Sequence, residues 1–357
     1  MGLFKNITIF GAGSGFTQTL PDISQTGKIF RVVDNDPGKW GKTVAGYKIF
    51  PPEVLQAKDS DEVIIICSHW KKSIARQLAA YGLQSGKDFF LDVNFLIKPE
   101  HYLRIFREFS SFLRRHDKLL AGKKALHIGV GHTLLVDILL AMAGARVICS
   151  NLDDELIFFP DLSLKKRIYE HIATFYANDS APFIMKPEAV IKRTTNGLSI
   201  DPSMVSFQVM DVENLAVASA SVDYIFSHDL LEHVEQPQKA IEECCRVLRP
   251  GGMFYHHIHP GDHRPEKTSF DMYTHPAQQW REICQKNGYH HNRWLSCQFI
   301  EAFANAAGTI IEAESRTAPG ISDVPLSLPH EIDQEFSRFT THDFLSSTGH
   351  LTIGGVV

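Results

Sequence analysis

Histidine is concentrated in residues 256–263, which read HHIHPGDH. An imidazole, with a pKa of about 6.5, can take a proton from a substrate hydroxyl at neutral pH, so this stretch fits general-base chemistry. We expect His259 or His263 to be the base. His228 and His233, in a separate stretch, are rivals for the same role. Histidines that only pack and hydrogen-bond within a loop are the alternative interpretation.

A metal site is another interpretation of the same stretch, since imidazoles together with Asp262 could ligate zinc, iron or manganese. The spacing matches no HExxH or similar ligand motif, so we predict no bound metal. The six cysteines show no CxxC pairing, and several fall in predicted strands or helices. They are typical of buried thiols in a reducing cytosol.

Residues 207–254 hold the elements that would position these histidines. Two short apolar runs, Phe207–Met210 and Val222–Phe226, are typical of buried strands. A helix is expected next, and the turn Pro250-Gly251-Gly252 ends it before another strand, Met253–Ile258. Ligands of such doubly wound sheets bind at the carboxyl ends of the strands, which is where the histidine stretch lies.

Side chains alternate between the two faces of the expected strand Met253–Ile258. His257 and His259 therefore share one face, and His256 lies on the other. The elements expected after this strand are a helix and an antiparallel strand pair, Ser296–Ala307, Thr309–Glu314 and Leu351–Val357.

A glycine turn precedes this unit. It joins an apolar strand that ends at Ile128 to the helix Leu134–Ala143, and the next strand, Ala145–Ser150, ends at Asn151. The order of strand, glycine turn, helix and strand is that of a nucleotide-binding βαβ unit.

Together these features resemble a class I S-adenosylmethionine-dependent methyltransferase over residues 121–357. The residues that carry the resemblance are Asp211, the VDYIF strand, the segment LEHV at 231–234 and the segment RVLRPGG at 246–252. It implies S-adenosyl-L-methionine as the cofactor, with an acid that binds the adenine amino group and a loop, 227–232, that lines the donor pocket. The donor-binding residues that it implies are Gly129, Gly131, Asn151, Asp211, Val212 and His228.

Three positions depart from the family pattern. The family has an acid where His127 stands, a third glycine where Thr133 stands, and a second acid where Asn151 stands. Asparagine can still hydrogen-bond a ribose hydroxyl, but without the strength of a charged carboxylate. Asp153 is a substitute two residues later. These changes leave open whether the donor binds.

The stretch YHHNRWLS at 289–296, together with Asp262 and His263, resembles a methyltransferase subgroup often associated with surface glycans. In that resemblance Asp262, Asn292 and Arg293 face the methyl acceptor. Arginine suits a phosphate or carboxylate through paired hydrogen bonds. An ion pair between Arg293 and an acid that orders the loop is the alternative.

The first part of the chain has a glycine turn of its own, GAGSG at 11–15, after the strand Asn6–Phe10. The turn would let the backbone approach a phosphate, and an acid about 20 residues on would bind a ribose. Phe16 stands where a dinucleotide fingerprint has glycine, which disfavours NAD. The region resembles the Rossmann-like domains of sugar-modifying proteins in surface-polysaccharide pathways. The residues expected at a second nucleotide or nucleotide-sugar site are Gly11, Gly13, Gly15 and Asp34.

The sequence therefore predicts an α/β protein with two doubly wound Rossmann-like domains joined by a helix: residues 1–97, a helix at 98–120, and residues 121–357. A formal net charge of -5 argues against nucleic acid as a partner. No apolar run approaches about 18 residues and no signal peptide is evident, so we expect a cytoplasmic protein that binds no membrane. A homo-oligomer stays open.

Three functions are consistent with these patterns. The first is methyl transfer from S-adenosylmethionine to a small polar acceptor, such as a sugar or nucleotide-sugar. The second is a non-catalytic nucleotide-sugar-binding or scaffold protein with a degenerate methyltransferase fold. The third is redox or sugar chemistry in the first domain, which is otherwise a structural or dimerising module.

Overall fold

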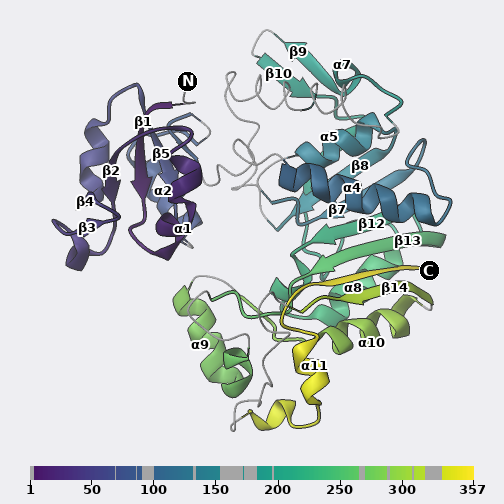
Figure 1. The fold of residues 1–357 in the computed structure, drawn as a ribbon. Coiled ribbons are helices and arrows are strands. Elements are labelled where there is room, and N and C mark those ends of the chain that lie inside the picture. Colours follow the sequence, from purple (N-terminus) through teal and green to yellow (C-terminus); the bar gives the residue numbers. More distant parts are fainter. Residues whose placement is uncertain are drawn as a thin grey trace.

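The computed structural model of the chain contains two main β-sheets (Figure 1). It describes residues 4–68, 70–85, 87–90, 100–131, 134–152, 172, 183–194, 197–264, 270–287, 290–307, 309–317 and 332–357. The sequence also predicts a helix at 164–176, and all of this range except residue 172 lies outside the described residues. Thr133, Asp153 and Tyr289 lie outside them too. The expected α/β class is confirmed, with mainly parallel strands and helices between them.

The first sheet has six strands in the order β3-β4-β2-β1-β5-β6. All neighbours in it pair in parallel except β3 and β4, which form a short hairpin. The sequence predicts strands at Asn6–Phe10, Ile29–Val33, Glu62–Cys67 and Asp88–Leu91, and these correspond to β1, β2, β5 and β6, whereas the hairpin was not predicted. The elements of this region are β1 (Phe4–Phe10), α1 (Ser14–Ile23), β2 (Gly27–Val33), η1 (Pro37–Lys39), β3 (Thr43–Val44), β4 (Tyr47–Phe50), η2 (Pro52–Ala57), β5 (Glu62–Ile66), α2 (Lys71–Ala80) and β6 (Phe89–Phe90).

The second sheet has seven strands in the order β11-β8-β7-β12-β13-β15-β14. The first five are parallel to one another, and β15 is antiparallel to both of its neighbours, as predicted for the last pair. The elements are α4 (Glu100–Arg115), β7 (Lys124–Ile128), α5 (Leu135–Met142), β8 (Arg146–Asn151), α7 (Pro187–Val190), β9 (Ile191–Thr194), β10 (Gly197–Ile200), β11 (Val205–Val209), β12 (Val222–His228), η3 (Leu231–His233), α8 (Pro237–Val247), β13 (Leu248–Ile258), η4 (Asp271–Thr274), α9 (Ala277–Asn287), α10 (Ser296–Ala307), β14 (Thr309–Ser315), η5 (Gln334–Phe336), α11 (Thr341–Leu345) and β15 (Leu351–Val356).

The Pro-Gly-Gly segment differs from the prediction, because it lies inside β13 and not before it. Val222 pairs with Leu248 and Tyr224 with Met253, so residues 249–252 loop out opposite a single residue. That residue, Asp223, forms an ion pair with Arg249 at 3.2 Å. The helix α8 therefore ends at Val247 and passes directly into a bulged strand.

The predicted joining helix, α4, packs against the second sheet. The ring of Phe109 stacks on Phe226 of β12 with centroids 4.3 Å apart, and Phe112 contacts Tyr255 of β13 at 5.0 Å. A Cβ at Gly354 of β15 would lie 2.4 Å from the Phe112 ring, so only glycine fits there. The apolar face of this helix is therefore part of a core, and α8 and α10 pack into a second apolar cluster with the same sheet.

No helix within the described ranges is both long and apolar enough to cross a membrane. All six cysteines are free thiols, and four of them are buried.

His256 of β13 belongs to the core. Its ring is fully buried, lies 5.0 Å from Phe303 of α10, and contacts Ser227 Oγ through Nδ1 at 2.8 Å. Burial lowers the pKa of His256 to about 3. An unfolded histidine has a pKa of about 6.5, so below that pH the unfolded chain takes up a proton that the folded chain does not.

We predict that the free energy of unfolding falls as the pH drops from about 6.5 toward 4, and that His256→Gln makes this fall shallower by up to about 1.4 kcal/mol per pH unit. Glutamine keeps a hydrogen-bonding group beside Ser227 but does not titrate. Urea unfolding of both proteins across this range measures the two slopes, and carboxylate titrations cancel in the comparison. If the free energy of unfolding fell equally steeply with pH in both proteins, His256 would not have a lowered pKa in the folded chain.

Candidate functional site

The carboxyl ends of five parallel strands meet at one edge of the second sheet. Register fixes the neighbours there: Ile128 of β7 pairs with Ser150 of β8 and with Ser227 of β12. Beside them, Asn151 pairs with Val209 of β11. The residues predicted to bind the methyl donor therefore come together at this edge, as expected for a doubly wound sheet.

The glycine turn after β7 is held in a form that glycine favours. Gly129 and Gly131 have φ of +72° and +69°, and a Cβ at Gly129 would lie 2.9 Å from the side chain of Leu230. At Gly131 a Cβ would meet nothing within 4 Å, so the backbone there faces open space. The Asn151 amide donates to the Gly131 carbonyl at 2.8 Å. One role of Asn151 is therefore to brace this turn.

Asp211 follows β11 and is exposed. Its Oδ1 accepts from the backbone N–H of Glu213 at 2.9 Å, and Val212 between them is buried. The carboxylate thus stands on a fixed turn at the edge of the sheet. An open glycine backbone, an exposed acid and Asn151 thus stand at one edge of the sheet, where the donor site is predicted, and their contacts with S-adenosylmethionine stay predictions.

His127 has a different role from the one its position in the glycine motif indicates. It is buried, its Nδ1 lies 2.9 Å from Asp137 Oδ1 of α5, and its ring stacks on Phe226 at 4.1 Å. The motif position is therefore filled by a strand-to-helix contact in the core. Of the three departures from the family pattern, this one serves packing.

Asp229 joins two histidines at the ends of β12 and β13, and sequence reasoning missed it. Its Oδ1 lies 2.9 Å from Nδ1 of His257, and its Oδ2 lies 3.2 Å from Nδ1 of His228. The two rings stack at 4.1 Å. Partial burial favours the neutral acid, but hydrogen bonds from both imidazoles hold the pKa of Asp229 well below its usual value. The site therefore contains an ionised carboxylate between two imidazoles.

Other histidines continue from this pair in ring-to-ring contact. His350, which precedes β15, lies 4.6 Å from His257 and 4.4 Å from His259, so these two share a face as predicted. His259 is 4.5 Å from His263. The members of this histidine row are His228, His257, His350, His259, His263, His233 and His291.

Burial keeps several of these rings neutral. It lowers the pKa of His259 to about 4, with the neighbouring His263 and His350 acting in the same direction. It also lowers the pKa of His233 to about 4, again with help from His263. Both rings are therefore neutral at pH 7 and weakly basic, which makes His259 a poorer general base than its position predicts.

The three residues expected at the acceptor are engaged in the structure of the loops. Asp262 has a buried carboxylate that pairs with Arg264. Asn292 donates to the carbonyls of Leu231 and Val234 at 2.7 and 3.1 Å.

Arg293 is 3% exposed, donates to the carbonyls of Met272 and His275, and pairs with Glu335 at 2.9 Å. This is the arrangement of the alternative interpretation, in which the arginine orders the loop. A direct contact of Asp262, Asn292 or Arg293 with an acceptor stays a prediction.

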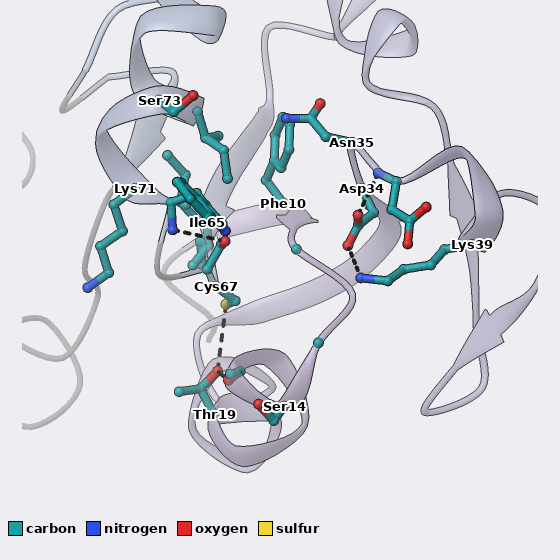
Figure 2. A pocket seen from close by; sticks show the side chains of 18 of the residues that line it. Phe10, Ser14, Thr19, Asp34, Asn35, Lys39, Ile65, Cys67, Lys71 and Ser73 are labelled. Atoms are coloured by element: carbon teal, nitrogen blue, oxygen red, sulfur yellow. Dashed lines mark hydrogen bonds and ion pairs between the residues drawn. The ribbon is translucent and has the colours of Figure 1, made fainter. Parts of the chain in front are cut away.

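The first sheet carries a cavity of about 710 Å³ at its glycine turn (Figure 2). A Cβ at Gly11 (φ +115°) would lie 2.6 Å from the Cys67 carbonyl, so glycine is needed for the close approach of β1 to β5. The predicted second-site residues all line this cavity. With them are three lysines, Lys39, Lys71 and Lys286, the last from α9.

Asp34 braces the turn of this cavity. Its carboxylate accepts from the N–H of Ala12 at 2.7 Å and of Asp36 at 2.8 Å, and it pairs with Lys39 at 3.0 Å. Burial favours its neutral form, yet these three donors together hold the pKa of Asp34 below its usual value. Much of the carboxylate is therefore used within the protein, while its predicted contact with a ribose stays untested.

Two family models match the chain. Residues 126–256 match one described as a methyltransferase domain, and residues 3–87 match one described as C2185-like, N-terminal.

The curated relatives are similar over part of their length. The chain is 54% identical over 44 residues to a malonyl-[acyl-carrier protein] O-methyltransferase of Methylococcus capsulatus. These residues cover 12% of this chain and 16% of that protein. It is 29% identical over 159 residues to a ubiquinone biosynthesis O-methyltransferase of Idiomarina loihiensis. The matched residues cover 44% of this chain and 50% of that protein. The chain thus spans half or less of the length of these relatives.

Among solved structures, an S-adenosylmethionine-dependent methyltransferase from Mesorhizobium loti aligns at 14% identity with a TM-score of 0.37, over 69% of this chain and 95% of that one. This similarity is too low to support an inference. The family match over residues 126–256 agrees with the motifs read from the sequence. Residues 126–256 therefore form a methyltransferase domain, for which S-adenosylmethionine is the cofactor.

Proposed function

We propose that this chain transfers a methyl group from S-adenosyl-L-methionine to an oxygen atom of a small polar acceptor. The observation that carries the proposal is the ionised Asp229, which holds two imidazoles at the same sheet edge as the glycine turn of the donor site. The relatives named above are O-methyltransferases, which supports oxygen as the acceptor atom.

His228 is the proposed general base. An ionised carboxylate accepts from its Nδ1, so Nδ1 carries the ring proton and Nε2 carries the lone pair. Nε2 is buried and has no hydrogen-bond partner among the described residues. A hydroxyl of the acceptor would supply that partner and give up its proton there, and Asp229 would stabilise the resulting imidazolium.

S-adenosylmethionine, when bound, supplies an electrophilic methyl group. The protein's own contribution is to position both substrates and to remove one proton. Gly129, Gly131 and Asn151 would hold the amino-acid and ribose parts, and Asp211 the adenine. A sugar or nucleotide-sugar is the acceptor that we propose, on the resemblance of the sequence to glycan-associated methyltransferases.

We predict that the chain binds S-adenosylhomocysteine and that Asp211→Ala raises its Kd by about tenfold, the loss of one hydrogen bond to a charged group. Calorimetry measures both values. Asp201→Ala is the matched control, because that half-buried acid precedes β11 at the opposite edge of the sheet. A wild-type chain that binds neither S-adenosylhomocysteine nor S-adenosylmethionine would instead favour the non-catalytic scaffold.

We also predict that Asp229→Asn lowers kcat by about 10²–10⁴-fold and leaves S-adenosylhomocysteine binding nearly unchanged. Asparagine tolerates the φ of +50° at this position but cannot fix the imidazole tautomers in the same way. Rates are measured with radiolabelled donor and the best acceptor from a panel of hexoses and UDP-sugars. His259→Gln is the comparison variant, and we expect a much smaller loss of kcat in it. Full activity of Asp229→Asn would contradict the assignment of the base.

We propose a second function for the cavity of the first sheet, the binding of a phosphate-bearing nucleotide or nucleotide-sugar. Lys71 and Lys286 line the cavity together with the first turn of α1, and these features favour an anion, while the charge of Lys39 is offset by Asp34. Gly13, which caps this helix, has open space where a Cβ would point.

We predict that UDP-glucose binds this cavity and that Gly13→Asp weakens the binding by at least about tenfold. An aspartate at this cap would hydrogen-bond the helix N–H groups and place a negative charge where the phosphate lies. Gly13→Ala fits the same space without charge and should bind within about threefold of wild type. Calorimetry with UDP-glucose and NAD⁺ measures both variants. If Gly13→Asp bound UDP-glucose as tightly as the wild type, the ligand would not bind at this turn.

A further inference from the structure

Glu232, His233 and His263 meet in a cluster that the proposed methyl transfer does not use. Each offers one ligand atom, a carboxylate oxygen or a ring nitrogen, and these atoms lie within 4.8 Å of one another. Glu232 and His233 come from η3, and His263 comes from the segment after β13. The three are brought together only by folding, because thirty positions separate His233 from His263.

The carboxylate of Glu232 is fully buried. Its Oε1 accepts from the backbone N–H of His259 at 3.1 Å. Its Oε2 is buried without a hydrogen-bond partner, and within the described part of the chain neither a lysine nor an arginine pairs with it. A buried carboxylate oxygen with no partner is costly unless a cation or a donor meets it.

Each histidine of the cluster has one ring nitrogen against a backbone carbonyl. Nδ1 of His233 lies 2.6 Å from the carbonyl of His290, and Nε2 of His263 lies 3.2 Å from the carbonyl of His259. A carbonyl only accepts, so those nitrogens carry the protons and the other nitrogen of each ring carries the lone pair. Metal-binding imidazoles are commonly oriented in this way by a carbonyl on the second nitrogen.

A neighbouring cluster of His228, Asp229 and His257 has the opposite arrangement. There the carboxylate already accepts from Nδ1 of both rings, so those nitrogens carry protons and the oxygens are engaged. That cluster suits proton transfer, whereas the Glu232 cluster contains a buried carboxylate oxygen without a hydrogen-bond partner among the described residues.

We propose that Glu232, His233 and His263 bind a divalent first-row transition metal ion such as Zn²⁺, Mn²⁺ or Fe²⁺. Two imidazoles and one carboxylate are donors that these ions accept, and three protein ligands leave positions open for water or substrate. The ion would supply the partner that Glu232 Oε2 lacks. The pattern could not be found in the sequence because it has no short ligand spacing. The methyl transfer proposed above assigns no role to these three residues.

Metal binding by the full chain, without a histidine tag, tests the proposal. The protein is treated with EDTA, freed of the chelator and titrated with Co²⁺, whose visible absorption reports its ligands. Zn²⁺ and Mn²⁺ are then added as competitors. We expect one ion per chain, and a loss of affinity of about 100-fold in both Glu232→Gln and His263→Ala.

Two variants serve as controls. His228→Ala removes a ligand of the neighbouring cluster, and His342→Ala removes an exposed histidine on α11. Both should bind Co²⁺ like the wild type. Circular dichroism and S-adenosylhomocysteine binding report folding, and His263 is only half-buried, so at least one decisive variant should stay folded. No Co²⁺ binding by the wild type at 100-fold excess, or loss in His228→Ala with retention in His263→Ala, would overturn the assignment.

Discussion

Parallel pairing of β12 with β13 is the constraint on which the candidate active site depends. It sets His228 opposite His257, and the N–H of Asp229 extends the pairing by donating to the carbonyl of His257 at 2.9 Å. At φ of +50° the chain turns at Asp229, so its carboxylate reaches both rings. A slip of one residue would exchange the two faces of β13 and bring His256 out of the core.

The bulge at residues 249–252 bears on this register. It lets β13 begin directly at the end of α8, and the ion pair between Arg249 and Asp223 holds the looped-out residues. On the other side of β13, the antiparallel pairing with β15 sets His256 opposite Ile353. The strand is therefore fixed from both sides. Asn292 fixes the adjacent turn η3 through two carbonyls, which positions Glu232 and His233 in turn.

Most of the fold could be predicted because its signals are local. Apolar runs bounded by proline and glycine predicted most strands of the two sheets, and α10 has the predicted bounds, Ser296–Ala307. The alternation of side chains between the two faces of β13 correctly placed His256 and His257 on opposite faces. The hairpin of β3 and β4 was missed because its strands are too short to show an alternation of apolar and polar residues.

The site was harder to predict because its contacts join distant residues. The role of Asp229 needs a left-handed turn and a neighbouring strand, neither of which a motif shows. His127 pairs with an acid on the opposite layer, ten residues away. A loop sequence also does not tell which way its side chains point, and Arg293 turns into the protein toward Glu335. The sequence therefore indicated which residues could do chemistry more readily than which groups those residues contact.

The two glycine turns have similar backbones but different charged neighbours. The cavity of the first sheet has three lysines, one of which, Lys39, pairs with Asp34, whereas the edge of the second sheet has the exposed Asp211 and the ionised Asp229. A donor with a positive sulfonium is attracted to the acids of the second sheet. The lysines of the first cavity attract a phosphate, while Asp34 offsets the charge of Lys39. The charges at the two turns therefore favour different ligands, as the two proposals require.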